Sequence, residues 1–241
     1  MRINRKLPSM KNIIRISGTI LIIVLFPSCT KEDDNIIRDI DGNVYTSVTI
    51  GTQVWMVENL KTTRYRNGDL IGTTTPATLD ITAEDSPKYQ WAYDGIECAV
   101  ATYGRLYTWY AVNDIREVCP IGWRVPNGED WSILYFPVNI PIGSIGGADL
   151  MESGRTHWNR SDIMGTNKTG FTGLPSGGRS SNGIFGGITQ SSIYWSSQES
   201  HPNSLAWFYT IPITYSYMES PLNDDLPKEY GLSIRCIKDN I

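Results

Sequence analysis

Turn signals recur so often along this chain that few of its segments are long enough for a helix of ordinary length. A glycine that follows Asp, Asn or another glycine marks six of these turns, namely Asp41-Gly42, Asn67-Gly68, Gly146-Gly147, Gly177-Gly178, Asn182-Gly183 and Gly186-Gly187. Such pairs reach the backbone conformations of tight turns at little steric cost. The pattern predicts one domain of short strands and loops after Ile40, where we find no linker, low-complexity block or convincing internal repeat.

The clearest strand signal lies near the start of this domain. Every second residue from 44 to 50 is β-branched, and these side chains would share one face of a strand. A turn at Gly51-Thr52 and a second run, Val-Trp-Met-Val at residues 54–57, follow directly. Because two such runs around a short turn are typical of a hairpin, we expect two antiparallel strands here.

Helix signals are few. Residues 104–113 place apolar side chains at helical spacing, and Asn127 is a suitable N-cap for a second helix that Pro137 would end. Residues 147–153 form a third, shorter candidate. We therefore expect an α+β fold with short twisted antiparallel sheets, two or three short helices and a long irregular loop region from about residue 155 to 225.

The first 28 residues are similar to a secretory signal peptide. Five basic residues precede an apolar run of eleven, and the chain then reads Leu-Phe-Pro-Ser-Cys at residues 25–29. The apolar run is too short for the roughly 20 residues that cross a bilayer as a helix. Residues 25–29 resemble a bacterial lipobox, which implies that Cys29 is acylated and begins the mature protein; an ordinary thiol beside a standard signal-peptidase site is the alternative. Translation from either Met1 or Met10 leaves a basic region before the apolar run.

The next ten residues, 29–38, include a polar and acidic stretch with nothing to bury, so we expect a solvated tether before a domain at 39–241. An acidic stretch directly after the lipid-bearing cysteine resembles the surface-export signal of Bacteroidetes lipoproteins. We therefore predict an outer-membrane lipoprotein of the cell envelope that faces outward, and a periplasmic orientation is the open alternative.

The charge balance bears on the partners of the mature protein. Five of the 21 basic residues fall within the first 28 positions, which leaves 16 basic residues against 25 acidic ones in the rest of the chain. Nucleic-acid binding depends on clustered Lys and Arg that neutralise phosphates, and no such cluster follows residue 28. We therefore exclude nucleic acid as a partner and expect contact with a membrane through the N-terminal lipid.

Several short motifs occur in a fixed order along the domain. They are Asp-Gly-Asn-Val-Tyr at 41–45, Ile-Gly-Thr-Gln-Val-Trp-Met-Val-Glu-Asn-Leu at 50–60, Tyr-Gly-Arg-Leu-Tyr at 103–107, Cys-Pro-Ile-Gly-Trp-Arg-Val-Pro at 119–126 and Ser-Ile-Arg-Cys at 233–236. Gly-Phe-Thr-Gly-Leu-Pro at 170–175 and Tyr-Trp-Ser-Ser at 194–197 extend the series. From about residue 39 to 239 the chain resembles the Fibrobacter succinogenes major paralogous domain, a family of bacterial secreted and lipid-anchored proteins.

A more distant resemblance involves the Trp-Arg-Val-Pro stretch, the helix expected after it and the terminal Ser-Ile-Arg-Cys strand. Together they are similar to the C-type-lectin-like fold and to formylglycine-generating enzymes, which implies a disulfide between Cys119 and Cys236. Export into an oxidising compartment agrees with that bond. The residues alone leave three pairings open, because Cys98 is a third cysteine of the domain. If Cys119 and Cys236 are paired, we expect Cys98 to be a small buried hydrophobic residue.

No catalytic constellation is recognisable in the sequence. His157 and His201 are the only histidines, and neither lies in a serine or cysteine nucleophile motif. Formylglycine-generating chemistry uses a cysteine pair before the last strand, whereas residues 195–230 contain no cysteine. We therefore expect that the protein is not an enzyme.

Aromatic residues divide into two groups along the chain. Five tryptophans fall in periodic or family-like segments, and we expect them in the core: Trp55, Trp91, Trp109, Trp123 and Trp131. Aromatic side chains in loops can stack on sugar rings or anchor a protein partner. The candidates for ligand binding in or beside the irregular region are Trp158, Tyr194, Trp195, Trp207, Tyr209, Tyr215 and Tyr217. The alternative is that these side chains hold the loops together.

We expect no cofactor, with calcium as the one alternative. A calcium site needs several converging oxygens. The candidate ligands are Glu199, Asn203, Asn223, Asp224 and Asp225.

These features predict a lipid-anchored, non-catalytic module for surface binding or adhesion, which recognises glycan or protein through the loops of residues 155–225. An enzyme that processes glycan is the first alternative, and it would need two carboxylates about 5–10 Å apart. Its candidate residues are Asp162, Glu199, Glu219 and Asp224. The second alternative is a structural envelope protein that binds no soluble ligand.

Overall fold

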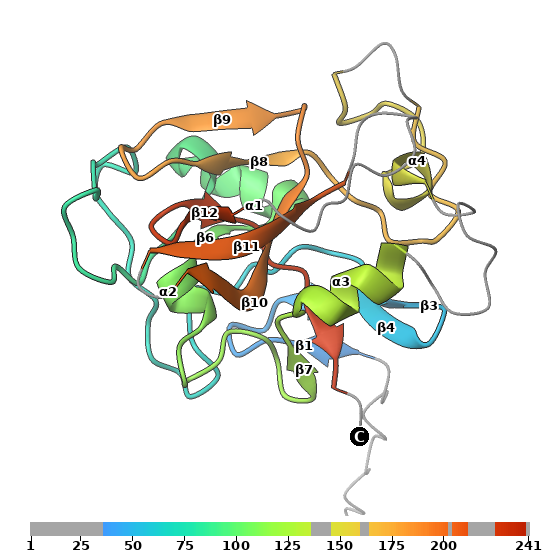
Figure 1. Cartoon of the computed structure of the whole chain (residues 1–241), viewed down its shortest axis with the longest axis horizontal. Coiled ribbons are helices and arrows are strands. Elements are labelled where there is room, and N and C mark those ends of the chain that lie inside the picture. The colour runs from blue at the N-terminus through green and yellow to red at the C-terminus, as the bar shows by residue number, and fades with distance from the viewer. Residues whose placement is uncertain (1–35, 136–145, 160–163, 202–203, 212–224, 240–241) are drawn as a thin grey trace, which may run out of the picture. The chain divides into compact units, whose positions relative to one another are not determined.

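The structure of the protein is a computed structural model that describes residues 36–135, 146–159, 164–201, 204–211 and 225–239 (Figure 1). Across these residues, short strands pair into four small antiparallel sheets, and the helices are short. The predicted α+β class, with short antiparallel sheets and few short helices, is confirmed.

The first hairpin follows the predicted pattern. β3 (Ser47–Ile50) and β4 (Gln53–Met56) pair antiparallel, and Gly51 occupies the turn with a φ of 60°. Glycine adopts this backbone conformation without a Cβ clash, so Gly51 permits the tight reversal. The last strand, β14 (Ile237–Lys238), pairs with β4 on one side and with β7 (Trp123–Arg124) on the other. The sheet order β3-β4-β14-β7 therefore joins the start, the middle and the end of the domain.

This sheet brings the two bonded cysteines together. Cys119 precedes β7 and Cys236 precedes β14, and their Cα atoms lie 6.1 Å apart although 117 positions separate them in the sequence. The disulfide that the resemblance to the C-type-lectin-like fold implied is confirmed. The expectation of a buried Cys98 is wrong, because this free cysteine is exposed in the 3-10 helix η2 (Glu97–Ala99), none of whose residues is buried.

A second sheet has five strands in the order β5-β6-β13-β8-β9. Its strands are β5 (Gln90–Trp91), β6 (Leu106–Thr108), β13 (Gly231–Leu232), β8 (Ser176–Arg179) and β9 (Phe185–Ile188). As in the first sheet, the strand from the C-terminal end lies inside, here between β6 and β8. The C-terminal segment thus completes both sheets.

The expectation of an irregular region from about residue 155 to 225 is wrong in part, because its described residues include five strands. Besides β8 and β9, it contains β10 (Ile193–His201) and β11 (Leu205–Thr210), which form a hairpin, and the start of β12 (Asp225–Pro227), which pairs with β11. Aromatic side chains fit a pleated, half-buried surface well. The aromatic residues of 193–210 therefore belong to strands rather than to loops.

The domain begins slightly earlier than the boundary predicted at residue 39. β1 (Ile37–Arg38) pairs antiparallel with β2 (Val44–Tyr45), so the last two residues of the expected tether belong to a strand. Asp39 closes the hairpin, because its Oδ1 accepts hydrogen bonds from the backbone N–H groups of Asp41 and Asn43 at 3.0 and 2.9 Å.

The helices of the described residues span one or two turns. They are η1 (Tyr93–Gly95), η2, α1 (Val100–Tyr103), α2 (Trp109–Val112), α3 (Gly128–Tyr135) and α4 (Gly147–Leu150). The predicted cap of α3 is confirmed: Asn127 Oδ1 accepts from the backbone N–H of Asp130 at 3.0 Å, and Asp130 Oδ2 accepts from that of Asn127 at 2.7 Å. Pro137, expected to end this helix, lies outside the described residues.

Two predicted helices are shorter than expected. Within 104–113, residues 106–108 form the strand β6, and only α2 is helical, because β6 finds partners in β5 and β13. α4 ends at Leu150 rather than Ser153, because Met151 is extended and forms a bridge to Gly173. Local helical spacing was overridden in both places by pairing with distant residues.

Buried apolar residues form two clusters. The first surrounds the disulfide and includes Trp109 and Trp195. The second is rich in aromatic residues and includes Trp55, Trp131 and Phe171. All five tryptophans expected in the core are buried, so that prediction is confirmed.

A buried arginine links strands from distant parts of the chain. Arg235 is fully buried and donates hydrogen bonds to Asn59 Oδ1, to the carbonyl oxygens of Met56 and Phe171, and to the Tyr194 hydroxyl. Its guanidinium also lies 4.4 Å from the centre of the Phe171 ring. Burial lowers the pKa of Arg235, because the charged form loses its hydration.

Candidate functional site

Five of the seven aromatic residues predicted to bind a ligand lie within the described residues, and four of these are buried. They are Trp158, Tyr194, Trp195 and Tyr209. Tyr209 stacks on Trp131 with ring centres 5.1 Å apart, and Tyr194 lies 5.5 Å from the same ring. The prediction that these four bind a ligand is wrong, because their rings pack the interior. Tyr215 and Tyr217 lie outside the described residues.

Trp207 differs from every other tryptophan of the chain. All eight tryptophans lie in the described part of the structure, and Trp207 alone is partly exposed while seven are buried. It lies in β11 opposite Asp225 of β12. Next to it in the sheet, His201 Nδ1 is 3.3 Å from Asp225 Oδ2, and the His201 side chain is exposed. A partly exposed tryptophan thus lies beside a polar pair on the sheet β10-β11-β12.

The described members of the predicted calcium set contact a lysine and a histidine side chain. Glu199 Oε1 accepts a hydrogen bond from Lys228 Nζ at 2.9 Å, and Asp225 contacts His201. Among the described residues, no three His, Cys, Asp or Glu side chains gather as a metal site. The other three candidates, Asn203, Asn223 and Asp224, lie outside the described residues, as do Asp162 and Glu219, the remaining carboxylates weighed for glycan hydrolysis.

Lys228 is the best-anchored polar group of this sheet region. Its side chain is 2% exposed, and Nζ lies 4.6 Å from the centre of the Trp109 ring besides contacting Glu199. Glu199 itself is half-exposed. The pair therefore fixes one carboxylate at the surface, where its second oxygen can accept a hydrogen bond from a ligand.

His157, the other histidine, has local partners. Its Nδ1 lies 2.8 Å from Glu152 Oε1, and its ring meets the edge of Tyr103 at a centre-to-centre distance of 5.6 Å. Burial, and secondarily the Glu152 charge, raises the pKa of Tyr103. These contacts tie the segment after α4 to α1.

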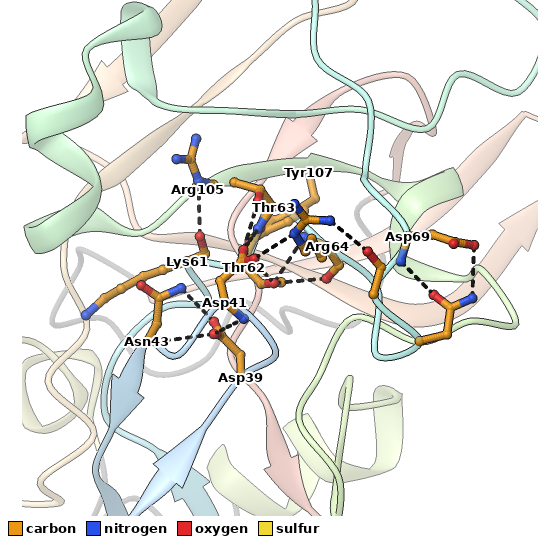
Figure 2. Close-up of polar contacts among 12 residues, drawn as sticks. Asp39, Asp41, Asn43, Lys61, Thr62, Thr63, Arg64, Asp69, Arg105 and Tyr107 are labelled. Atoms are coloured by element: carbon orange, nitrogen blue, oxygen red, sulfur yellow. Dashed lines mark hydrogen bonds and ion pairs between the residues drawn. The ribbon is translucent and has the colours of Figure 1, made fainter.

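A second group of polar contacts joins three loops that the sequence did not single out. Figure 2 shows the Asp41 carboxylate directed at the segment that follows the first hairpin. Asp41 Oδ2 accepts hydrogen bonds from Thr63 N and Thr63 Oγ1 at 2.6 and 2.8 Å, and Oδ1 lies 3.2 Å from Arg64 Nε. Hydrogen bonds from Thr63 lower the pKa of Asp41 in spite of its partial burial. The β1–β2 turn is thereby fastened to residues 62–70.

Two arginines fasten residues 62–70 to the loop after α2. Arg66 donates to the carbonyl oxygens of Cys119, Pro120 and Trp123 at 3.0, 3.1 and 2.9 Å, and it also contacts the Glu117 carboxylate. Arg116 lies on the loop after α2 and contacts Asp69 and Asp114. Its guanidinium also lies 3.9 Å from the centre of the Tyr65 ring. We call the three connected segments, residues 39–43, 62–70 and 113–121, the loop rim.

The loop rim carries large aliphatic side chains that point into solvent. Ile115 is 96% exposed, Ile121 82%, Leu70 65% and Ile40 53%. Their sequence signal is an isolated aliphatic residue between polar or turn-forming neighbours, as in Asp-Ile-Asp, Asp-Ile-Arg and Pro-Ile-Gly. Such residues belong to no strand or helix pattern, so the periodicity of the sequence does not reveal them.

A comparison with known families identifies the domain. The sequence model of the Fibrobacter succinogenes major domain matches residues 48–238, which is most of the chain. The chain belongs to this family. No curated protein and no solved structure matched it significantly. The similarity to the C-type-lectin-like fold therefore stays a prediction.

The matched range gives the Fibrobacter succinogenes major domain a structural meaning. It begins within β3 and ends with β14, so it includes both sheets that the C-terminal strands complete, together with the disulfide. It also includes Trp207 and two of the three segments of the loop rim. Among the helices of the described residues, none has the length and apolar character needed to cross a membrane.

Proposed function

We propose that this major-domain protein is a lipid-anchored component of the cell envelope whose domain is a non-catalytic glycan-binding module. The binding surface is centred on Trp207 in the sheet β10-β11-β12. The observation that carries this proposal is that Trp207 alone among the eight tryptophans is partly exposed, while it packs against the aromatic cluster behind it.

The chemistry around Trp207 suits a sugar. The face of an aromatic ring packs against the C–H face of a pyranose, while hydroxyl groups of the sugar need hydrogen-bond donors and acceptors at the edge of the ring. Asp225 and His201 supply these beside Trp207. Because the sheet holds Trp207, little conformational freedom is lost on binding.

The envelope location has two supports. Residues 25–29 resemble a lipobox that would place an acyl chain on Cys29. The disulfide between Cys119 and Cys236 suits an oxidising compartment outside the cytoplasm. Metabolic labelling with a fatty acid, compared between the wild type and Cys29→Ala, tests the anchor directly.

Glycan binding is tested with a soluble fragment of residues 31–241, since residues 35–241 form a compact unit with its own hydrophobic clusters. On a glycan array we expect saturable binding that weakens by about tenfold or more in Trp207→Ala and is largely retained in Trp207→Phe, which keeps an aromatic face. Ile184→Ala, on the distant β8–β9 turn, is the matched control and should bind as the wild type does.

Two further results test the calcium alternative and the proposed site. Repeating the array with calcium and with a chelator shows whether the ion takes part, and equal binding in both removes the calcium alternative. Absence of binding to every glycan, or identical binding by wild type and Trp207→Ala, overturns the proposed site.

A further inference from the structure

We propose that the loop rim is a membrane-docking surface, which lays its exposed aliphatic side chains on a phospholipid bilayer. This inference rests on the lipid anchor of the proposed function. It adds that the domain has a preferred orientation at the membrane, with residues 39–43, 62–70 and 113–121 facing the lipid.

The first support is the concentration of exposed aliphatic residues. Single exposed apolar side chains are normal on protein surfaces and need no explanation. Here Ile40, Leu70, Ile115 and Ile121 lie on three loops that are joined by direct contacts. Ile115 precedes Arg116, whose partner Asp69 precedes Leu70, and Ile121 follows Pro120, whose carbonyl oxygen binds Arg66. The four exposed residues therefore lie on loops that contact one another directly.

The second support is the rigidity of the loops. Arg66 binds three carbonyl oxygens of the 113–123 segment, and Cys119 in the same segment is fixed by the disulfide. An exposed loop that needed only to connect α2 with β7 would not require this number of contacts. A rigid loop holds its apolar tips outward at little entropic cost when they enter an apolar medium.

The third support is the distance to the anchor. Ile36, where the described chain begins, follows Cys29 by seven positions, and seven extended residues reach at most about 25 Å. An acylated Cys29 therefore keeps the β1–β2 hairpin close to the bilayer. Asp41 connects that hairpin to Arg64, so the loop rim lies on the part of the domain that is joined to the tether.

The polar side chains of the loop rim are compatible with shallow insertion. Arg64 and Arg116 are partly exposed beside the aliphatic residues, and long basic side chains can lay their stems on apolar groups while their charges reach lipid headgroups. Asp69 and Glu117 lie on the same surface and reduce its net charge. The attraction should therefore come from aliphatic burial and depend little on salt.

The test uses the full mature lipoprotein in vesicles of phosphatidylethanolamine and phosphatidylglycerol. Single nitroxide labels are introduced with Ile115→Cys or Ile121→Cys in a Cys98→Ser background. Ile184→Cys is the matched control, because Ile184 is likewise an exposed aliphatic residue, 65% exposed, between β8 and β9. Figure 1 shows β8 and β9 at the end of the fold away from β1 and β7. Collision with a water-soluble nickel chelate reports the exposure of each label.

We expect labels at 115 and 121 to lose at least about fivefold of their collision rate on vesicles, relative to the label at 184. Equal collision rates at all three positions, in protein that floats with the vesicles, overturn the docking surface and leave the anchor intact. Protein that fails to float with vesicles overturns both the anchor and the docking. Fatty-acid labelling of Cys29 then shows whether the acyl chain itself is missing.

A second measurement separates lipid from protein as the occupant. The unlipidated Cys29→Ala protein, labelled at 121, is examined in solution at increasing concentration. Shielding that appears without vesicles and grows with protein concentration assigns the loop rim to a contact between copies and overturns lipid docking. Ile115→Asp combined with Ile121→Asp should expose a label at Leu70→Cys on vesicles, whereas Ile184→Asp should not.

Discussion

Arg235 in the interior and Arg116 in the loop rim use the same guanidinium group in opposite surroundings. Arg235 is fully buried, and its hydrogen bonds within the described structure end on neutral oxygens of an amide, two carbonyls and a hydroxyl. Arg116 is about one-third exposed and contacts the carboxylates of Asp114 and Asp69. Both lie over an aromatic ring, Phe171 and Tyr65 respectively.

The difference shows where the fold depends on a charge. A buried cation needs a hydrogen-bond acceptor for each of its N–H donors. Removing the cation leaves those buried acceptors without a donor, which is costly. An exposed ion pair can exchange its partner for water at little cost. We therefore expect the interior around Arg235 to determine global stability, and the contacts of the loop rim to determine local geometry.

Breaking the covalent link between the two regions should have the largest effect. The Cys119–Cys236 disulfide closes a loop of 117 residues, and Cys119→Ser with Cys236→Ser should lower the free energy of unfolding by about 4–5 kcal/mol in the chain-entropy model. Urea unfolding followed by tryptophan fluorescence measures this loss. Cys98→Ser removes an exposed free thiol and is the control, with no change expected.

Replacing the buried arginine should come next. Arg235→Met leaves Asn59 Oδ1 and the Phe171 carbonyl without their donors, and we expect a loss of about 3–5 kcal/mol in the free energy of unfolding. Urea midpoints of Arg235→Met and Arg116→Met are compared in parallel. A loss that is no larger for Arg235→Met than for Arg116→Met would contradict the contrast between the two arginines.

Arg66 should fall between the two extremes. It is about one-quarter exposed, yet it binds three carbonyl oxygens around the disulfide. We expect Arg66→Met to cost about 1–2 kcal/mol and to increase amide hydrogen exchange in residues 113–123 more than elsewhere. Glu117→Gln removes only the exposed ion pair and should leave exchange in that segment nearly unchanged. Uniform exchange changes across the domain would assign Arg66 to the core instead.

The smallest effect concerns acid. Hydrogen bonds from Arg116 lower the pKa of Asp114 below its usual value, in spite of partial burial that acts in the opposite direction. The unfolded state, with a pKa of about 3.9, then binds more protons below about pH 5. The contribution of Asp114 is complete above that range and is lost as the pH falls through the folded pKa. Between pH 5 and pH 2, stability should fall less steeply in Asp114→Asn than in the wild type, as measured by urea unfolding at each pH.

Local sequence signals predicted the elements whose cause is local. The β3–β4 hairpin depends on Gly51 and on alternation within a few residues, and the start of α3 depends on Asn127 and Asp130. The pairing of Cys119 with Cys236 came from the resemblance to the C-type-lectin-like fold and is confirmed, whereas the residues alone left three pairings open. That resemblance supplied the one long-range contact that spacing could not.

The candidate site was predicted poorly because burial is a long-range property. Tyr194 and Tyr209 lie in a glycine- and serine-rich part of the chain that looks irregular, yet they face each other across β10 and β11 and pack on Trp131 from a distant helix. Trp207 lies two residues before Tyr209 on the same face of β11 and packs against the same aromatic cluster, but it is only partly covered. The loop rim was not predicted either, because Ile115 and Ile121 lie singly between polar and turn-forming residues and show no strand or helix periodicity.

The central position of the C-terminal strands also determines when the two larger sheets can form during synthesis of the chain. β13 and β14 lie between strands from much earlier in the sequence, so neither of the larger sheets can close until the final residues have emerged. Such distant pairings form slowly, and a chain still being synthesised lacks them altogether. A product truncated before residue 231 would present β4, β6, β7 and β8 as unpaired edges, ready for proteolysis or aggregation.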